Sequence, residues 1–304
     1  MHRVVAYITA YKDALSLNQC LQAIWAQDYS VETVAIVDNS PARLAIECEA
    51  ALKKIKVWHC PKNIGIAGGL NKAIPWASRE GYDFIWLFDQ DSRPEPNCLS
   101  CLLQAYESLS AEVAVGIVAP LTVDDRTLFT IQPVMFCRDG FREVDLSKFK
   151  QPQPCDAPIT SGSLVCLQTF PQVLPPDARL LIDGVDLDYG LRMKRAGYQN
   201  FVVPEALLSH SFGEPTPVRF LGRSLYFQEY SAFRYYYICR NHTYLEMKFS
   251  RGGYRLTCGL KRLYFLIGRM VRLAIAAKEK KAQKMYACVR GTIDGLLGSI
   301  DQPF

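Results

Sequence analysis

Residues 84–91 have the sequence Phe84-Ile85-Trp86-Leu87-Phe88-Asp89-Gln90-Asp91. The uninterrupted apolar run predicts a strand buried on both faces, as in parallel sheets that helices cover on both sides. The run stops at two carboxylates, Asp89 and Asp91. Burying a carboxylate without a partner costs several kcal/mol, so we expect both at an edge of the sheet rather than in its core.

Similar apolar runs alternate with segments of helical periodicity along the first part of the chain. The runs are Val4–Thr9, Val34–Val37, Ile55–Trp58 and Val113–Val118. This alternation predicts an α/β fold with a doubly wound, mostly parallel sheet. We expect Pro75 to kink or end the helix that contains it. Later in the chain we expect strands at Ile159–Leu167 and Phe201–Val203, and a tyrosine-rich helix from Ser224 to Phe249.

Charge divides the chain unevenly. Residues 248–290 contain twelve Lys and Arg and one acidic residue, whereas the whole chain carries a net +5. We therefore expect one α/β domain at residues 1–223 and a C-terminal helical extension at residues 224–304; the later resemblance implies that the first is catalytic. On a helical wheel, the basic residues of 255–272 lie opposite the apolar ones. This pattern indicates an amphipathic helix attracted to an anionic membrane surface. The alternative is a helix that packs its apolar face on the body and leaves its basic face in solvent.

The cysteines and the chain start indicate the compartment. The pair Cys98 and Cys101 has no second close pair of Cys or His, so the eleven cysteines predict free thiols in a reducing cytoplasm rather than a zinc site. No apolar run reaches about 18 residues, the minimum for a membrane span. The start, Met1-His2-Arg3, does not resemble a secretion signal.

Three carboxylates follow predicted strands and should meet at one edge of the sheet: Asp38, Asp89 and Asp91. Ligands of doubly wound folds bind at the carboxyl ends of the strands. An Asp-x-Asp directly behind a buried strand predicts a Mg²⁺ or Mn²⁺ site that a diphosphate completes, and the cation would neutralise a departing nucleoside diphosphate. A solvated turn is the competing interpretation.

Other segments add candidate groups. Small residues at 63–69 suit either backbone contact with a phosphate or close helix–strand packing. Residues 183–188 hold three carboxylates at a helix start, more than capping requires, and Asp186 is a candidate general base. His210 is either a ligand or a structural histidine.

At these segments the chain resembles glycosyltransferase family 2, which has the GT-A fold, and most of all its bacterial rhamnosyltransferases. The matching segments follow the family order over about residues 3–250: 9–11, 37–40, 63–71, 87–92, 160–163, 182–188, 209–213 and 237–241.

The resemblance implies a role for each matched residue. The catalytic base of an inverting displacement would be Asp186, and the metal ligands would be Asp89, Asp91 and His210. The donor-binding residues would be Thr9, Tyr11, Asp38, Asn63, Gly65, Asn71 and Asp89. The acceptor-side residues would be Ser161, Gly162, Asp183, Asp188 and Arg240.

The expected function is a metal-dependent transfer of a sugar, best matched by L-rhamnose from dTDP-L-rhamnose, to a lipid-linked or polysaccharide acceptor of the cell surface. The alternatives are another sugar, such as galactofuranose or a hexose, or a non-catalytic scaffold of a glycan-assembly complex. A sugar nucleotidyltransferase would need a basic, glycine-rich loop where residues 9–13 stand. A glycoside hydrolase would need no nucleotide pocket. The expected partners are the donor, the acceptor and the inner face of the cell membrane, without nucleic acid; the oligomeric state stays open.

Overall fold

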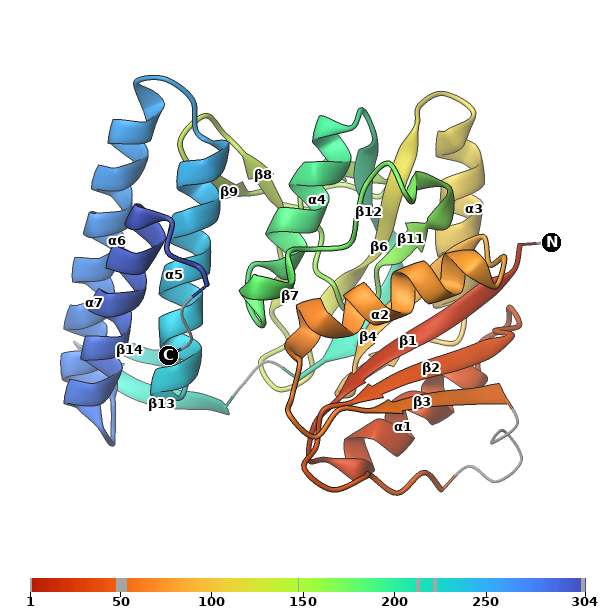
Figure 1. Cartoon of the computed structure of the whole chain (residues 1–304), viewed down its shortest axis with the longest axis horizontal. Helices are drawn as coiled ribbons and strands as arrows, with labels where there is room; N and C mark the ends of the chain where they lie inside the picture. The colour runs from red at the N-terminus through yellow and green to blue at the C-terminus, as the bar shows by residue number, and fades with distance from the viewer. Residues whose placement is uncertain (1, 48–53, 147, 212–213, 221–222, 302–303) are drawn as a thin grey trace. The chain divides into compact units, whose positions relative to one another are not determined.

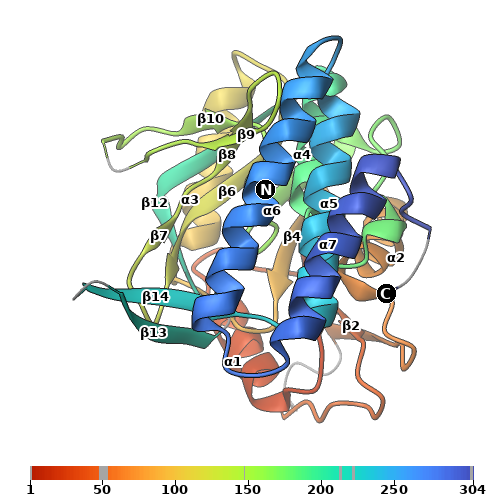
Figure 2. The same cartoon turned by 90° about the vertical axis from the view of Figure 1, so that its left-hand side faces the viewer.

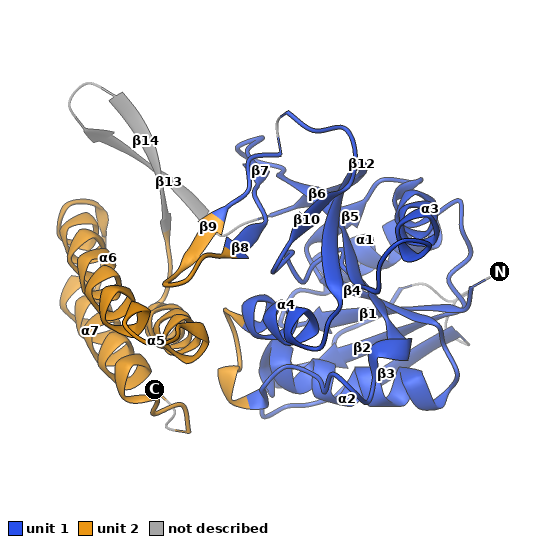
Figure 3. Ribbon diagram, turned by 90° about the horizontal axis from the view of Figure 1, so that it is seen from above, with its two compact units in different colours: residues 1–135, 143–178, 185–211 blue, residues 136–142, 179–184, 212–304 orange. Residues whose placement is uncertain are grey.

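The computed structural model describes residues 2–47, 54–146, 148–211, 214–220, 223–301 and 304. Contacts divide the chain into two compact units (Figure 3). Unit 1 comprises residues 1–135, 143–178 and 185–211, and unit 2 comprises residues 136–142, 179–184 and 212–304. The boundary at 223/224 stays a prediction; it falls within β14 (Arg223–Glu229), which pairs antiparallel with β13 (Glu214–Phe220).

Unit 1 contains a ten-stranded sheet in the order β10-β12-β6-β11-β4-β1-β2-β3, with β5 added to β12 and β7 to β6 (Figure 1). Its strands are β1 (Val4–Ala10), β2 (Thr33–Asp38), β3 (Ile55–His59), β4 (Phe84–Asp89), β5 (Ser92–Pro94), β6 (Val115–Asp124), β7 (Thr130–Ile131), β10 (Gln153–Cys155), β11 (Leu164–Cys166) and β12 (Gln199–His210). The long strands pair in parallel, and the short β5, β7, β10 and β11 pair antiparallel. The predicted doubly wound, mostly parallel sheet is confirmed.

Helices cover both faces of this sheet (Figure 1). They are α1 (Ala14–Trp25), α2 (Gly65–Arg79), α3 (Cys98–Ser110) and α4 (Val185–Arg195), with 3-10 turns η2 (Leu167–Thr169) and η3 (Ala178–Leu180). Alternate strand residues such as Ile8 and Trp86 pack with α1 and α3 in one core. The helices α2 and α4 cover the opposite face. Each fully buried large apolar side chain stabilises this arrangement by about 1.5–3 kcal/mol.

Three expectations for unit 1 differ in part from the structure. Of the two outcomes expected at Pro75, an end of the helix does not occur, since α2 continues to Arg79 with Ile74 and Ala77 buried on either side of the proline. Only residues 164–166 of the predicted strand 159–167 are extended, since a turn precedes them. The short strand predicted at 201–203 is the long β12, whose register shifts between Val203 and Leu207.

Unit 2 contains three helices that lie side by side (Figure 2). They are α5 (Ala232–Phe249), α6 (Tyr254–Ala276) and α7 (Lys281–Leu297). The helix predicted from Ser224 begins only at Ala232, because residues 223–229 are extended and the Ser231 hydroxyl caps α5 by accepting the N–H of Arg234. Gly291 and Gly295 let α7 approach the backbone of α5.

Two further short strands, β8 (Val134–Phe136) and β9 (Phe141–Glu143), pair with each other. Of the helices in the described ranges, none combines the length and apolarity needed to cross a membrane.

Candidate active site

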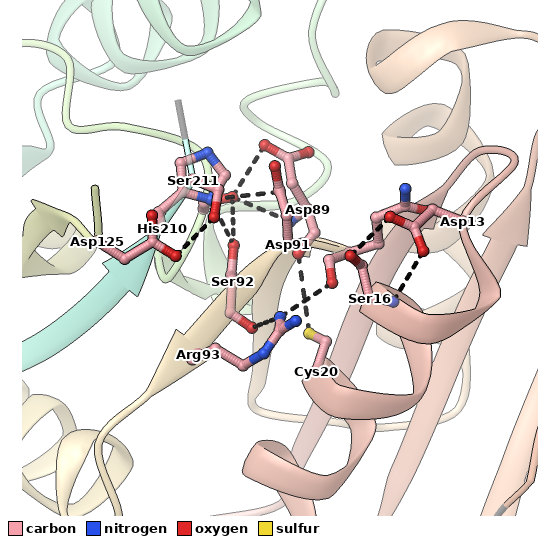
Figure 4. Close-up of polar contacts among 12 residues, drawn as sticks. Asp13, Ser16, Cys20, Asp89, Asp91, Ser92, Arg93, Asp125, His210 and Ser211 are labelled. Carbon is pink, nitrogen blue, oxygen red and sulfur yellow. Dashed lines mark hydrogen bonds and ion pairs between the residues drawn. The ribbon is translucent and has the colours of Figure 1, made fainter. Parts of the chain in front are cut away.

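The carboxylate pair lies where β4 ends. Asp89 is the last residue of β4, and Asp91 stands in the turn before β5. Because β5 pairs antiparallel with the end of β12, His210 lies opposite Ser92. This register places His210 Nδ1 3.4 Å from Asp91 Oδ1 (Figure 4). The three predicted metal ligands therefore come from the same corner of the sheet.

Two serines connect these groups. The Ser161 hydroxyl donates to Asp89 Oδ2 at 2.9 Å and accepts the N–H of Asp89 at 2.9 Å. The Ser92 hydroxyl lies 3.1 Å from Ser161 Oγ and 3.0 Å from His210 Nδ1. Both serines are fully buried. Such hydrogen bonds fix the rotamers of the groups that they join.

The surroundings of Asp91 disfavour the charged form of its carboxyl group. Burial raises the pKa of Asp91, His210 opposes this shift, and the charge of Asp89 adds to it. In the described part of the chain, no three His, Cys, Asp or Glu side chains are already arranged to hold a metal. Mg²⁺ is typically held by one or two carboxylates together with substrate phosphates. Two adjacent carboxylates and an imidazole fit a site of that type, which the donor diphosphate would complete.

The predicted base, Asp186, lies in the first turn of α4. It lines a small cavity of about 10 Å³ together with Leu87, Thr160 and Ser163. The turn at residues 160–163 thus contacts the cavity beside Asp186 and, through Ser161, the carboxylate of Asp89. One Asp186 oxygen accepts the N–H of Leu187 at 2.9 Å.

The turn at 160–163 requires its glycine. Gly162 has φ +83°, and a Cβ there would lie 2.5 Å from the Pro120 ring. Its N–H donates to the carbonyl of Leu87 at 2.7 Å, and its carbonyl accepts Nε1–H of Trp86 at 2.8 Å. These bonds tie the turn to β4, which explains how the turn positions Ser161 against Asp89.

The other acidic residues of the 183–188 segment are engaged elsewhere. Asp188 is fully buried, pairs with Arg192 at 2.9 Å and accepts the N–H of Asp177 at 3.1 Å. Asp183, in unit 2, pairs with Arg234 at 3.2 Å. Both geometries are those of structural ion pairs.

The predicted nucleotide residues lie at the ends of β1 and β2. Asp38 is buried, and its two carboxylate oxygens accept the N–H groups of Ser40 at 3.0 Å and Leu44 at 2.9 Å. The Thr9 hydroxyl donates to the Tyr7 hydroxyl at 3.0 Å. Tyr11 follows β1 and its side chain is exposed. The register pairs Thr9 with Asp89, so this end of β1 adjoins the carboxylate pair.

The glycine-rich segment forms the start of α2. The Asn63 side chain accepts the N–H of Gly65 at 3.0 Å, and both residues have positive φ. Ile64, at the N-cap, supplies no side-chain hydrogen bond to the first helical turn. Gly69 serves packing, since a Cβ there would strike the Tyr7 hydroxyl. The Asn71 side chain donates to the carbonyl of Pro176 at 2.6 Å and so holds a loop.

Arg240 lies inside unit 2, where it is 1% exposed. Its guanidinium donates to the carbonyls of Arg179 at 2.7 Å and Ile300 at 3.1 Å. A buried guanidinium that holds backbone carbonyls does not present its charge to an acceptor, so the acceptor role expected for Arg240 is not carried into the proposal below. Residues 212–213 of the segment after His210 lie outside the described residues.

Ser92 is the site residue that sequence reasoning missed. It follows Asp91 directly, but a serine in a polar turn carries no distinctive pattern. Its role depends on the pairing of β5 with β12, which brings it to His210. No local signal predicts that pairing.

Residues 6–153 match the model of Glycosyl transferase family 2, so this part of the chain carries a glycosyltransferase domain. The sheet, parallel at its centre and with carboxylates gathered at its strand ends, agrees with the GT-A fold of solved glycosyltransferases.

Individual relatives extend this result. The dTDP-rhamnosyl transferase RfbF of Shigella flexneri is 25% identical over 297 residues, 97% of this chain and 96% of that protein. The galactofuranosyltransferase GlfT1 of Mycolicibacterium smegmatis is 26% identical over 199 residues, 64% of this chain and 66% of that protein. A crystal structure of GalNAc-T7 with UDP, GalNAc and Mn²⁺ superposes with a TM-score of 0.55 at 13% identity, over 73% of this chain and 44% of that chain.

Proposed function

We propose that this protein is an inverting, metal-dependent glycosyltransferase that moves L-rhamnose from dTDP-L-rhamnose to a lipid-linked or polysaccharide acceptor in cell-surface glycan synthesis. The observation that carries the proposal is the cluster of Asp89, Asp91 and His210 at the strand ends, joined by Ser92 and Ser161. It lies where doubly wound folds bind nucleotides.

In this proposal Asp91, with Asp89 and His210 beside it, holds Mg²⁺ or Mn²⁺. The cation would offset the negative charge that develops on the departing diphosphate. The crystal structure of GalNAc-T7, which shares the fold, contains Mn²⁺ together with UDP and GalNAc. The proposed donor subsite continues through Thr9, Asp38 and the start of α2, whose first-turn N–H groups suit a phosphate.

Asp186 is proposed as the general base. It would take the proton of the acceptor hydroxyl as that oxygen attacks the anomeric carbon. The cavity that Asp186 lines is also lined by the turn at residues 160–163, and Ser161 of that turn donates to Asp89; this supports the role, since base and leaving group must act on one sugar. Ser161 and Gly162 shape this side of the site.

The choice of rhamnose rests on RfbF, which matches nearly the whole chain, whereas GlfT1 matches about two thirds. Galactofuranose is therefore the second candidate donor. We propose a cytoplasmic protein that works on the inner face of the membrane, where a lipid-linked acceptor would be found.

The test is turnover with a panel of nucleotide sugars, with and without acceptor glycolipid extracts, followed by NMR of the product's anomeric centre. Release of dTDP with inversion at the anomeric carbon is the expected result. If the protein turned over only a UDP-sugar, galactofuranose, the second candidate, would replace rhamnose as the proposed donor sugar. If no donor were bound or turned over, the protein would instead be proposed as a non-catalytic scaffold of a glycan-assembly complex.

A further inference from the structure

Helix α6 exposes a continuous apolar face. Eight large apolar residues of α6 are between 44% and 75% exposed, and all but Phe265 belong to this face: Leu256, Leu260, Leu263, Tyr264, Ile267, Val271 and Ile275. Their spacing of three and four residues places them on one face of the helix. Monomeric soluble proteins rarely show a continuous apolar stripe of this kind, so this face requires a partner.

Three basic residues on the other side of α6 make contacts within unit 2, whereas Arg255 and Arg272 are exposed. The Lys261 ammonium pairs with Asp139 at 2.5 Å, and the Arg262 guanidinium pairs with Glu246 at 3.5 Å. Arg269 lies over the ring of Tyr235. These contacts fix the rotation of α6 about its axis. The helix therefore cannot turn its basic face outward without losing them.

The ends of the helix carry the exposed positive charge. Arg251 and Arg255 precede or begin α6, and Lys278, Lys280 and Lys281 follow it; all five are exposed. The one acidic residue between positions 248 and 290 is Glu279. An apolar stripe with cations at both ends complements a lipid surface with anionic headgroups. A second copy of this chain would place like charges together in either helix orientation, which disfavours a dimer through this face.

We infer that α6 lies flat on an anionic lipid bilayer and inserts its apolar face, so that hydrophobic contact carries the attachment and the terminal cations add to it. The inference rests on the proposed action at a membrane and deepens it by naming the face that binds. It differs from attachment through the basic face, which would be electrostatic and sensitive to salt.

The test is co-sedimentation of the full chain with vesicles of phosphatidylcholine and phosphatidylglycerol, at low and high salt. The test variant is Leu260→Ser/Ile267→Ser/Val271→Ser, whose side chains are exposed and whose loss should not disturb folding. The matched control is Leu128→Ser/Phe129→Ser, which removes exposed apolar residues of unit 1. Calorimetric binding of the soluble donor is measured in parallel, to separate this inference from the proposed function.

We expect the chain to remain on anionic vesicles at high salt, and the triple variant to lose about tenfold or more in partitioning at either salt. The control variant should bind vesicles as the original chain does, and all should bind donor equally. Release by salt with an unaffected triple variant would overturn the inference, as would a chain that never sediments. If light scattering showed a dimer that the triple variant abolishes, the partner of the apolar face would be a second copy of the chain and not a membrane.

Discussion

Asp91 Oδ1 lies 3.4 Å from His210 Nδ1, although the two residues are far apart in the sequence (Figure 4). The pairing of β5 with β12 produces this contact. Ser92 of β5 is paired with His210 in that register, and its hydroxyl forms a hydrogen bond with the same imidazole. An imidazole and a carboxylate held by the sheet itself are already in place before any ligand arrives.

Ser92 should raise the metal affinity of the site through its hydrogen bond with His210, without being a metal ligand itself. In Ser92→Ala, His210 loses the hydroxyl that lies 3.0 Å from its Nδ1. Loss of such an orienting contact typically weakens metal affinity by about 10–100-fold. We expect the Mn²⁺ concentration needed for half-maximal turnover to rise by at least the lower figure. An unchanged metal requirement would show that Ser92 only packs the core.

Substitutions of Asp186 and Asp188 should affect different properties, the rate of transfer for Asp186 and the stability of the fold for Asp188. Asp186→Asn should keep donor binding and folding while slowing transfer by about 10²–10⁴-fold, the usual contribution of a general base. Asp188→Asn should break a buried ion pair and cost about 2 kcal/mol or more of stability. Donor calorimetry, turnover and thermal unfolding separate the two. Loss of donor binding in Asp186→Asn would make Asp186 a structural residue instead.

Asn241 should support the loop that leads into α4. Its buried side chain donates to the carbonyls of Leu180, Ile182 and Asp183, each at 2.8 Å. In Asn241→Leu these carbonyls lose a donor, at a cost of about 1–3 kcal/mol. We expect a lower Tm and slower turnover, because the loop ends three residues before Asp186, with donor affinity unchanged. If turnover were normal below the lowered Tm, Asn241 would contribute to stability but not to catalysis.

Gly162 should be intolerant of any side chain. Alanine at this position combines a left-handed φ with a Cβ 2.5 Å from Pro120. Strain and overpacking together should destabilise unit 1 by about 1–3 kcal/mol or displace the turn that carries Ser161. Gly197→Ala is the matched control, since its φ is also positive but its Cβ would meet nothing within 4 Å. Equal Tm losses in both variants would assign the effect to φ and not to the contact with Pro120.

The sequence predicts the sheet and the carboxylate edge because both follow from local patterns. Apolar runs such as residues 84–88 identify buried strands, and parallel strands bring their carboxyl ends to one edge. The length of β12 escaped prediction because Pro204 and Glu205 interrupt its apolar pattern, where the register with β6 shifts. The position of His210 depends on that long strand.

The orientation of α6 also lies beyond the sequence. Periodicity identifies a basic and an apolar face, but not which of them is buried. Asp139 and Glu246, the acidic partners of the basic face, come from distant segments of the chain. The expected alternatives were a basic face turned to lipid or an apolar face packed on the body. In the structure the apolar face is exposed, and Lys261 and Arg262 of the basic face form ion pairs.

The most direct test of the proposed function is calorimetric titration of dTDP-L-rhamnose into the full chain with Mn²⁺, and again with excess chelator. The same titration is made for Asp91→Asn, with Asp125→Asn as the control for a nearby carboxylate that pairs with Ser211. The proposal predicts binding that chelator abolishes, that Asp91→Asn weakens at least tenfold (about 1.4 kcal/mol) and that Asp125→Asn leaves intact. Equal binding with chelator, or in Asp91→Asn, would contradict the metal-dependent site at the end of β4.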